Sequence, residues 1–173
     1  MATSSSNKMP LLVDRPLHSF ATIGGTAGLT SATDYNTPAP AGFVVLVDCS
    51  GNDGAVVDSL SIVALEASTT ARNVLVFLST ASTATSITTA NSAYVAGATI
   101  GSTARGERTN IPLPPLSVPV PNLGADSSIT ETDKKNTGLY VPSSALLYVG
   151  VDQAIAAPSA NTRVHVFAQG GFF

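Results

Sequence analysis

Residues 73–79 read Asn-Val-Leu-Val-Phe-Leu-Ser, and this stretch decides the class of fold. Val74 and Val76 alternate with Leu75 and Phe77, so both faces of an extended chain would be apolar here. A short, continuous apolar run bounded by polar residues is typical of a strand that is covered on both sides. The stretch therefore predicts a central β-strand.

Other short apolar runs lie on both sides of this stretch and are bounded by turn residues. They cover residues 17–23, 43–48, 56–65, 94–100, 139–142, 145–152 and 163–168. No window of ten or more residues shows the apolar period of 3.6 that an amphipathic helix needs. The clearest of these runs amount to six or seven strands, which predict an all-β fold with two packed antiparallel sheets, either a sandwich or a jelly roll. A closed barrel is the alternative.

The segments between these runs predict loops. Residues 80–93 are almost entirely Ser, Thr and Ala around Ile87, and Ser and Thr disfavour helix interiors, so a long loop is expected. Residues 94–100 predict a strand that Gly97 weakens. Residues 111–121 contain five prolines, which cannot donate to a sheet ladder, so an extended crossover on the surface is expected.

The length of 173 residues suits one domain and is too short for two ordinary ones. Residues 1–12 begin with a polar serine run, which predicts an extended N-terminal arm. Residues 13–173 then form a single β-sandwich domain.

Charged residues make up only 11% of the chain and the net charge is −3, whereas 20 serines and 20 threonines supply neutral polarity. This composition argues against a charge-rich disordered chain and against a nucleic-acid partner. No apolar run approaches the roughly 20 residues of a membrane helix, and no signal-peptide core is present, so we expect synthesis as a soluble cytoplasmic chain without a membrane partner. Cys49 is the only cysteine, which excludes an intrachain disulfide.

Residues 48–52, Asp-Cys-Ser-Gly-Asn, are similar to the Asp-x-Ser-x-Ser magnesium loop of von Willebrand type A domains. The similarity fails because Asn52 replaces the second serine and a strand pattern follows where that fold needs a helix. A plain turn between strands is the prediction, with no metal and no cofactor.

Catalytic chemistry is not indicated either. His18 and His165 both lie in predicted strands, no Gly-x-Ser-x-Gly sequence exposes a serine, and Cys49 is expected to be a buried small hydrophobic residue. We expect no enzymatic activity and no catalytic residues. A sugar-binding role remains open through Tyr35, Tyr94 or Tyr140, which lie in or near predicted loops.

The end of the chain resembles small virion proteins of tailed bacteriophages. The resemblance lies in residues 140–152, Tyr-Val-Pro-Ser-Ser-Ala-Leu-Leu-Tyr-Val-Gly-Val-Asp, and in residues 163–173, which end in Gly-Gly-Phe-Phe. It implies a jelly-roll-like capsid cement or decoration protein that binds the outside of an icosahedral phage capsid and stabilises contacts between capsomers. The expected partners are the major capsid protein and further copies of the chain, with a homotrimer favoured, and the expected location is the capsid surface of the virion.

Two segments are the expected contacts with such a capsid, namely the N-terminal arm and the proline crossover. The candidate residues are Met9, Pro10, Leu11, Leu12, Pro112, Pro114, Pro115 and Leu116. The alternative is a glycan-binding or adhesin-like module of a phage tail fibre.

Overall fold

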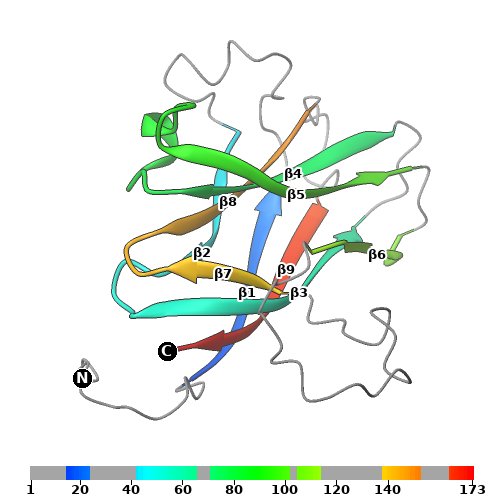
Figure 1. Cartoon of the computed structure of the whole chain (residues 1–173). Coiled ribbons are helices and arrows are strands. Elements are labelled where there is room, and N and C mark those ends of the chain that lie inside the picture. The colour runs from blue at the N-terminus through cyan, green and yellow to red at the C-terminus, as the bar shows by residue number, and fades with distance from the viewer. Residues whose placement is uncertain (1–14, 24–41, 66–70, 102–104, 114–137, 153–163) are drawn as a thin grey trace, which may run out of the picture.

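Strands dominate the computed structural model, which describes residues 15–23, 42–65, 71–101, 105–113, 138–152 and 164–173. Within these ranges nine strands form two antiparallel sheets that pack face to face, one above the other in Figure 1. The predicted all-β, two-sheet sandwich is confirmed. The predicted arm over residues 1–12 and residues 114–121 of the crossover lie outside the described residues, so both stay predictions, as does the single domain over residues 13–173.

The five-stranded sheet has the order β1-β9-β3-β6, and β7 also pairs with β3. Because β9 occupies one edge of β3, both β6 and β7 lie along its other edge, beside opposite ends of the strand. The bounds are β1 Arg15–Ile23, β3 Gly54–Ala64, β6 Arg108–Ile111, β7 Leu139–Pro142 and β9 Val164–Phe172.

The four-stranded sheet has the order β2-β8-β4-β5. Its strands are β2 Val44–Asp48, β4 Arg72–Ser79, β5 Ser92–Ile100 and β8 Leu146–Val151. The prediction that residues 73–79 form a central strand is confirmed, since β4 lies between β8 and β5.

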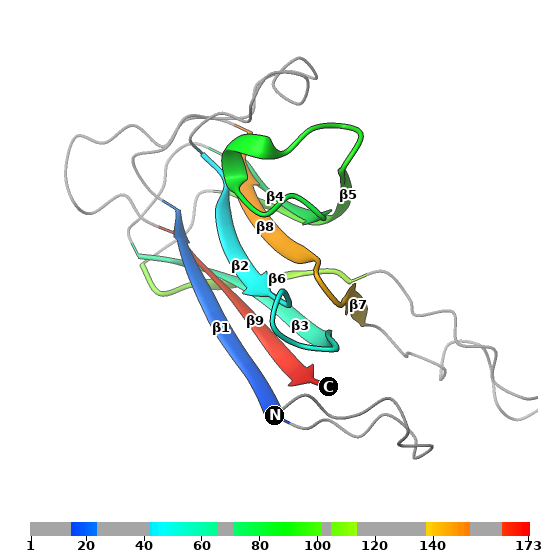
Figure 2. The same cartoon turned by 90° about the vertical axis from the view of Figure 1, so that its left-hand side faces the viewer.

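The strand pairs are nested within one another, which is the topology of a jelly roll. β4 pairs with β5, β3 with β6, β2 with β8 and β1 with β9, so the chain resembles one long hairpin folded over on itself. Two further pairings, β3 with β9 and β4 with β8, join the folded ribbon into sheets. Figure 2 shows β1 and β9 side by side in one sheet, and β2 and β8 in the other.

The main core fills the space between the sheets with alternate residues of nearly every strand. Along β3, Leu60, Ile62 and Ala64 are buried in this core, as the alternation of residues 56–65 predicts. Ser19 of β1 donates a hydrogen bond of 2.6 Å to the carbonyl oxygen of Leu46 in β2, which ties the edges of the two sheets together.

Strand β8 is buried on both faces. Its inner residues, including Leu147 and Val149, join the main core, whereas Leu146 and Tyr148 face outward into a second apolar cluster. The β4–β5 connection covers that cluster with Ala81 and Ile87, and it contains a 3₁₀ turn at Ala84–Ser86. The predicted long loop is thus a lid over the outer face of the four-stranded sheet.

Three details of the strands differ from the sequence-based expectations. β6 was not predicted, because only two of its residues, Thr109 and Ile111, face the core and because the segment lies in a charged cluster. β9 continues past Ala168 to Phe172, because Gly170 has no side chain that would clash with the backbone of Val56 in β3. β2 was expected to be buried but is an edge strand, with Val45 40% exposed.

Gly170 allows β3 and β9 to approach each other closely. A β-bulge interrupts the pairing between Val57 and Ser59, and the carbonyl oxygen of Val56 would lie only 1.9 Å from a Cβ atom on Gly170. Backbone cannot move aside as a flexible side chain can, so only glycine fits at this position.

We expect Gly170→Ala to lower the free energy of unfolding by about 2 kcal/mol or more, because the added methyl group meets backbone atoms. Gly101→Ala is the matched control, since a Cβ atom there has no neighbour within 4 Å. Urea unfolding followed by circular dichroism measures both variants. Equal stability of the two variants would contradict the register of β3 and β9.

Tyr148→Phe tests the lid. The Tyr148 hydroxyl donates a hydrogen bond of 2.8 Å to the carbonyl oxygen of Ala81, and burial, followed by the charge of Asp48, raises the pKa of Tyr148. Removing the donor leaves that carbonyl buried without it, so we expect a loss of about 1–3 kcal/mol. Tyr94→Phe, on a ring that is 57% exposed, should change stability by less than about 0.5 kcal/mol in the same assay.

Candidate functional site on the outer face of the five-stranded sheet

The outer faces of the two sheets differ in whether their apolar side chains are covered. In the described part of the chain, one buried apolar cluster fills the space between the sheets and a second lies outside the four-stranded sheet. The outer face of the five-stranded sheet instead carries partly exposed aromatic side chains, of which Phe20 is 61% exposed. This face is therefore the candidate functional site.

The strand register places the outward side chains in rows across the sheet. One row runs Phe20, Phe167, Ser61, Asn110, and the next runs Thr22, His165, Val63, Arg108, in each case from β1 through β9 and β3 to β6. A third row holds His18, Gln169 and Ser59. Residues in neighbouring strands of a row are about 5 Å apart, so these side chains form one continuous surface.

Three rings form the centre of this surface. The centroid of Phe20 lies 5.6 Å from that of His165 and 5.9 Å from that of Phe167, and His165 and Phe167 are also 5.9 Å apart. The Arg108 guanidinium lies 6.0 Å from the centroid of Phe167, within the range of a cation–π contact. We call Phe20, His165, Phe167 and Arg108 the aromatic face.

Uncharged polar groups surround the aromatic face. Asn110 and Gln169 are exposed, and Ser59 donates a hydrogen bond of 3.3 Å to the Gln169 side-chain oxygen. Ser61, next to Phe167, is only 8% exposed. The surface can thus stack against a flat apolar group and offer amide and hydroxyl hydrogen bonds beside it.

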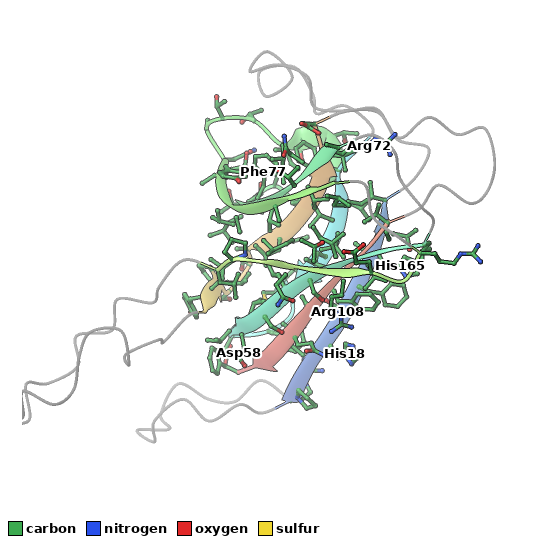
Figure 3. All side chains as sticks on the ribbon, turned by 90° about the vertical axis from the view of Figure 1, so that its right-hand side faces the viewer. His18, Asp58, Arg72, Phe77, Arg108 and His165 are labelled. Carbon is green, nitrogen blue, oxygen red and sulfur yellow. The ribbon has the colours of Figure 1, made fainter. Side chains whose placement is uncertain are left out.

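Both histidines of the chain belong to this outer surface. The prediction that they lie in strands is confirmed, with His18 in β1 and His165 in β9. His18 is paired with Gln169 in the register, and His165 with Thr22. Figure 3 shows His18, His165 and Arg108 at the five-stranded sheet, with Phe77 at the other sheet.

The tyrosines considered for sugar binding do not form one site. Tyr140 lies on the outer face of the five-stranded sheet, 45% exposed and 6.4 Å from the Phe173 ring. Tyr94 belongs to β5 in the other sheet and packs edge-on against Phe77, over Gly97. Tyr35 lies outside the described residues.

The turn at residues 48–52 is held together by its own hydrogen bonds. The Ser50 amide donates a hydrogen bond of 2.8 Å to the Asp48 carboxylate, and the Asn52 amide donates one of 3.2 Å to the Cys49 carbonyl oxygen. The Arg15 guanidinium donates a hydrogen bond to the Asn52 side-chain oxygen. These contacts support the interpretation as a plain turn. Among the described residues, no group of three or more His, Cys, Asp or Glu side chains could hold a metal ion.

Cys49 is fully buried in the main core, as the sequence predicts. Burial, and after it the charge of Asp48, raises the pKa of Cys49 from 9.0 to about 11. The thiol is therefore protonated at neutral pH, and a protonated, buried thiol is a poor nucleophile.

Of the predicted capsid contacts, only Pro112 is among the described residues. Met9, Pro10, Leu11, Leu12, Pro114, Pro115 and Leu116 lie outside the described residues. Pro112 is exposed and follows directly after β6, which ends at Ile111.

Sequence reasoning missed the aromatic face, although the period-two signal was present. Leu17, Ala21 and Ile23 face the core, which leaves His18 and Phe20 outward. In β9, Val164, Val166 and Ala168 face the core in the same way, which leaves His165 and Phe167 outward. The alternation within each strand does not show that β1 and β9 are neighbours in the sheet.

Comparison of the chain with models of protein families, with curated proteins and with solved structures finds no match. In the ranges that the structure describes, no helix is long and apolar enough to cross a membrane.

The raised pKa of Cys49 predicts a specific loss of stability in alkali. The folded state binds the thiol proton more tightly than the unfolded state, so this contribution is complete below pH 9 and is lost as the pH rises toward 11. Cys49→Ala removes it, so the free energy of unfolding should fall less steeply over this range than in the parent chain. Urea titrations at several pH values compare the slopes, and equal slopes would contradict the burial of the thiol.

Proposed function

We propose that this chain is a structural virion protein that binds the outside of an icosahedral phage capsid and stabilises contacts between capsomers. The observation that carries the proposal is the strand order. Nested pairs from β1·β9 to β4·β5 make a jelly roll, and jelly rolls recur in viral capsid proteins. This support is an analogy of fold, which the resemblance of residues 140–152 and 163–173 to small phage virion proteins strengthens.

The composition also supports a role that depends on area of contact. Short Ser, Thr and Ala side chains lose little rotamer entropy when a contact forms, and a charged fraction of 11% keeps the desolvation cost low. A protein attached to a repeating lattice can therefore gain affinity from many weak contacts.

Attachment in this proposal uses the N-terminal arm and the proline crossover. Strand β1 begins at Arg15, so the arm over residues 1–12 precedes the sandwich, and Pro112 starts the crossover directly after the edge strand β6. The proposed partners are the major capsid protein and two further copies of the chain in a homotrimer.

Cryo-electron microscopy of purified particles tests the proposal directly. We expect density for the jelly roll on the outer surface of the capsid, at junctions between capsomers. Absence from the shell, or density only in the tail, would overturn it, and the second result would favour the tail-fibre alternative. Native mass spectrometry of the isolated protein tests the trimer separately.

Deleting residues 1–12 should weaken attachment at least tenfold while the sandwich stays folded, because every described strand begins after them. Co-sedimentation with capsids that lack the protein measures attachment, and thermal unfolding by circular dichroism checks the fold. A second variant replaces Pro112, Pro114, Pro115 and Leu116 with Ala and should weaken attachment in the same assay. Unchanged attachment in both variants would remove these segments from the proposal.

A further inference from the structure

We propose that the aromatic face is a binding site for an acidic oligosaccharide, meaning one that carries carboxylate groups on its sugar rings. The inference stands apart from capsid attachment, which uses other residues of the chain. It rests on three observations taken together: the ring cluster, the polar groups around it, and the sign of the charge beside it.

The ring cluster matches the apolar part of a sugar. One face of many pyranose rings presents C–H groups, and the electron-rich face of an aromatic ring attracts such weakly positive hydrogens. Phe20, Phe167 and His165 lie within 5.9 Å of one another by their centroids and come from two paired strands, so the backbone fixes their spacing. With Phe20 61% exposed, a bound sugar would displace water from a large apolar surface.

The surrounding side chains can form hydrogen bonds with the hydroxyl groups at the edge of a sugar ring. Hydroxyl groups both donate and accept hydrogen bonds, and the amides of Asn110 and Gln169 do the same. Asn110 lies in the row of Phe20 and Phe167, and Gln169 lies two residues after Phe167 along β9.

The charged group that lies against the rings is the Arg108 guanidinium. The two rows that contain the aromatic face hold Arg108 and no carboxylate at their outward positions. A guanidinium binds a carboxylate with two parallel hydrogen bonds, and Arg108 lies over the Phe167 ring, next to the exposed Phe20 ring on which a sugar can stack. This complementarity selects acidic over neutral sugars.

A second copy of the chain fits the same face less well. In a two-fold dimer the face would meet itself, and the two rows that contain the aromatic face bring the cation of Arg108 and no carboxylate of their own to pair with it. The charge pattern therefore favours a foreign anionic ligand.

Calorimetric titration of the isolated full-length protein tests the proposal. The probes are oligogalacturonate, oligoalginate and sialyllactose, with a neutral glucan oligosaccharide and poly-L-glutamate as comparisons. We expect at least one acidic oligosaccharide to bind tenfold more tightly than the neutral one. Phe20→Ala should weaken that binding at least tenfold. Arg108→Gln should remove most of the preference for the acidic probe.

Tyr94→Ala is the matched control, because Tyr94 is also an exposed aromatic residue but belongs to the other sheet. It should leave binding unchanged, and thermal unfolding should show that every variant is folded. The proposal is overturned if no acidic oligosaccharide binds at millimolar concentration, or if Phe20→Ala binds like the parent chain. Equal binding of poly-L-glutamate would also overturn it, in favour of an acidic protein surface. Each of these results leaves capsid attachment untouched, since no capsid is present.

Discussion

The pairing of β3 with β9 is the constraint on which the rest of the structure depends. Its register runs from Ala55 opposite Phe172 to Ala64 opposite Val164, and it places β9 between β1 and β3. A slip of one residue would turn Val166 and Ala168 to solvent and bury Phe167 and His165 in the core. The close approach at Gly170 resists a slip that would place Gln169 there, because a Cβ atom at that position would lie 1.9 Å from the carbonyl oxygen of Val56. The register thus determines both the core and the aromatic face.

The outer face of one sheet is covered by the chain, and the outer face of the other is exposed. The four-stranded sheet is covered by the β4–β5 connection, which places Ile87 and Ala81 over Tyr148. The five-stranded sheet presents its outer rows with Phe20 exposed. The outer face of the four-stranded sheet is thus covered by the chain itself, whereas the outer face of the five-stranded sheet is open to a ligand. The proposed oligosaccharide site requires such an open face.

Much of the fold could be predicted from the sequence, because burial leaves a period of two in the strands. The alternation of Leu60, Ile62 and Ala64 and the doubly apolar run at residues 73–79 both led to strands of the predicted kind. β6 escaped prediction because a four-residue edge strand buries almost no apolar side chain, and pairing with β3 rather than composition makes it a strand.

The candidate site was less accessible to sequence reasoning than the fold. Phe20 and Phe167 are far apart in the chain, and each looks like an ordinary strand residue. Only the pairing of β1 with β9 puts them opposite each other. The sequence led instead to tyrosines near loops, of which Tyr140 shares the outer face and Tyr94 does not.

The nested strand pairs also have a consequence for synthesis on the ribosome. β4 and β5 follow each other in the chain and are joined by residues 80–91, whereas Ser59 of β3 and Gln169 of β9 are 110 residues apart. Contacts between distant residues form slowly, because a long loop must close before they stabilise anything. We expect the inner hairpin to form first and the edge of β3 to wait unpaired until β9 has been made. An unpaired strand edge invites association with other chains, so the nascent chain is prone to aggregation until β9 has emerged and paired with β3.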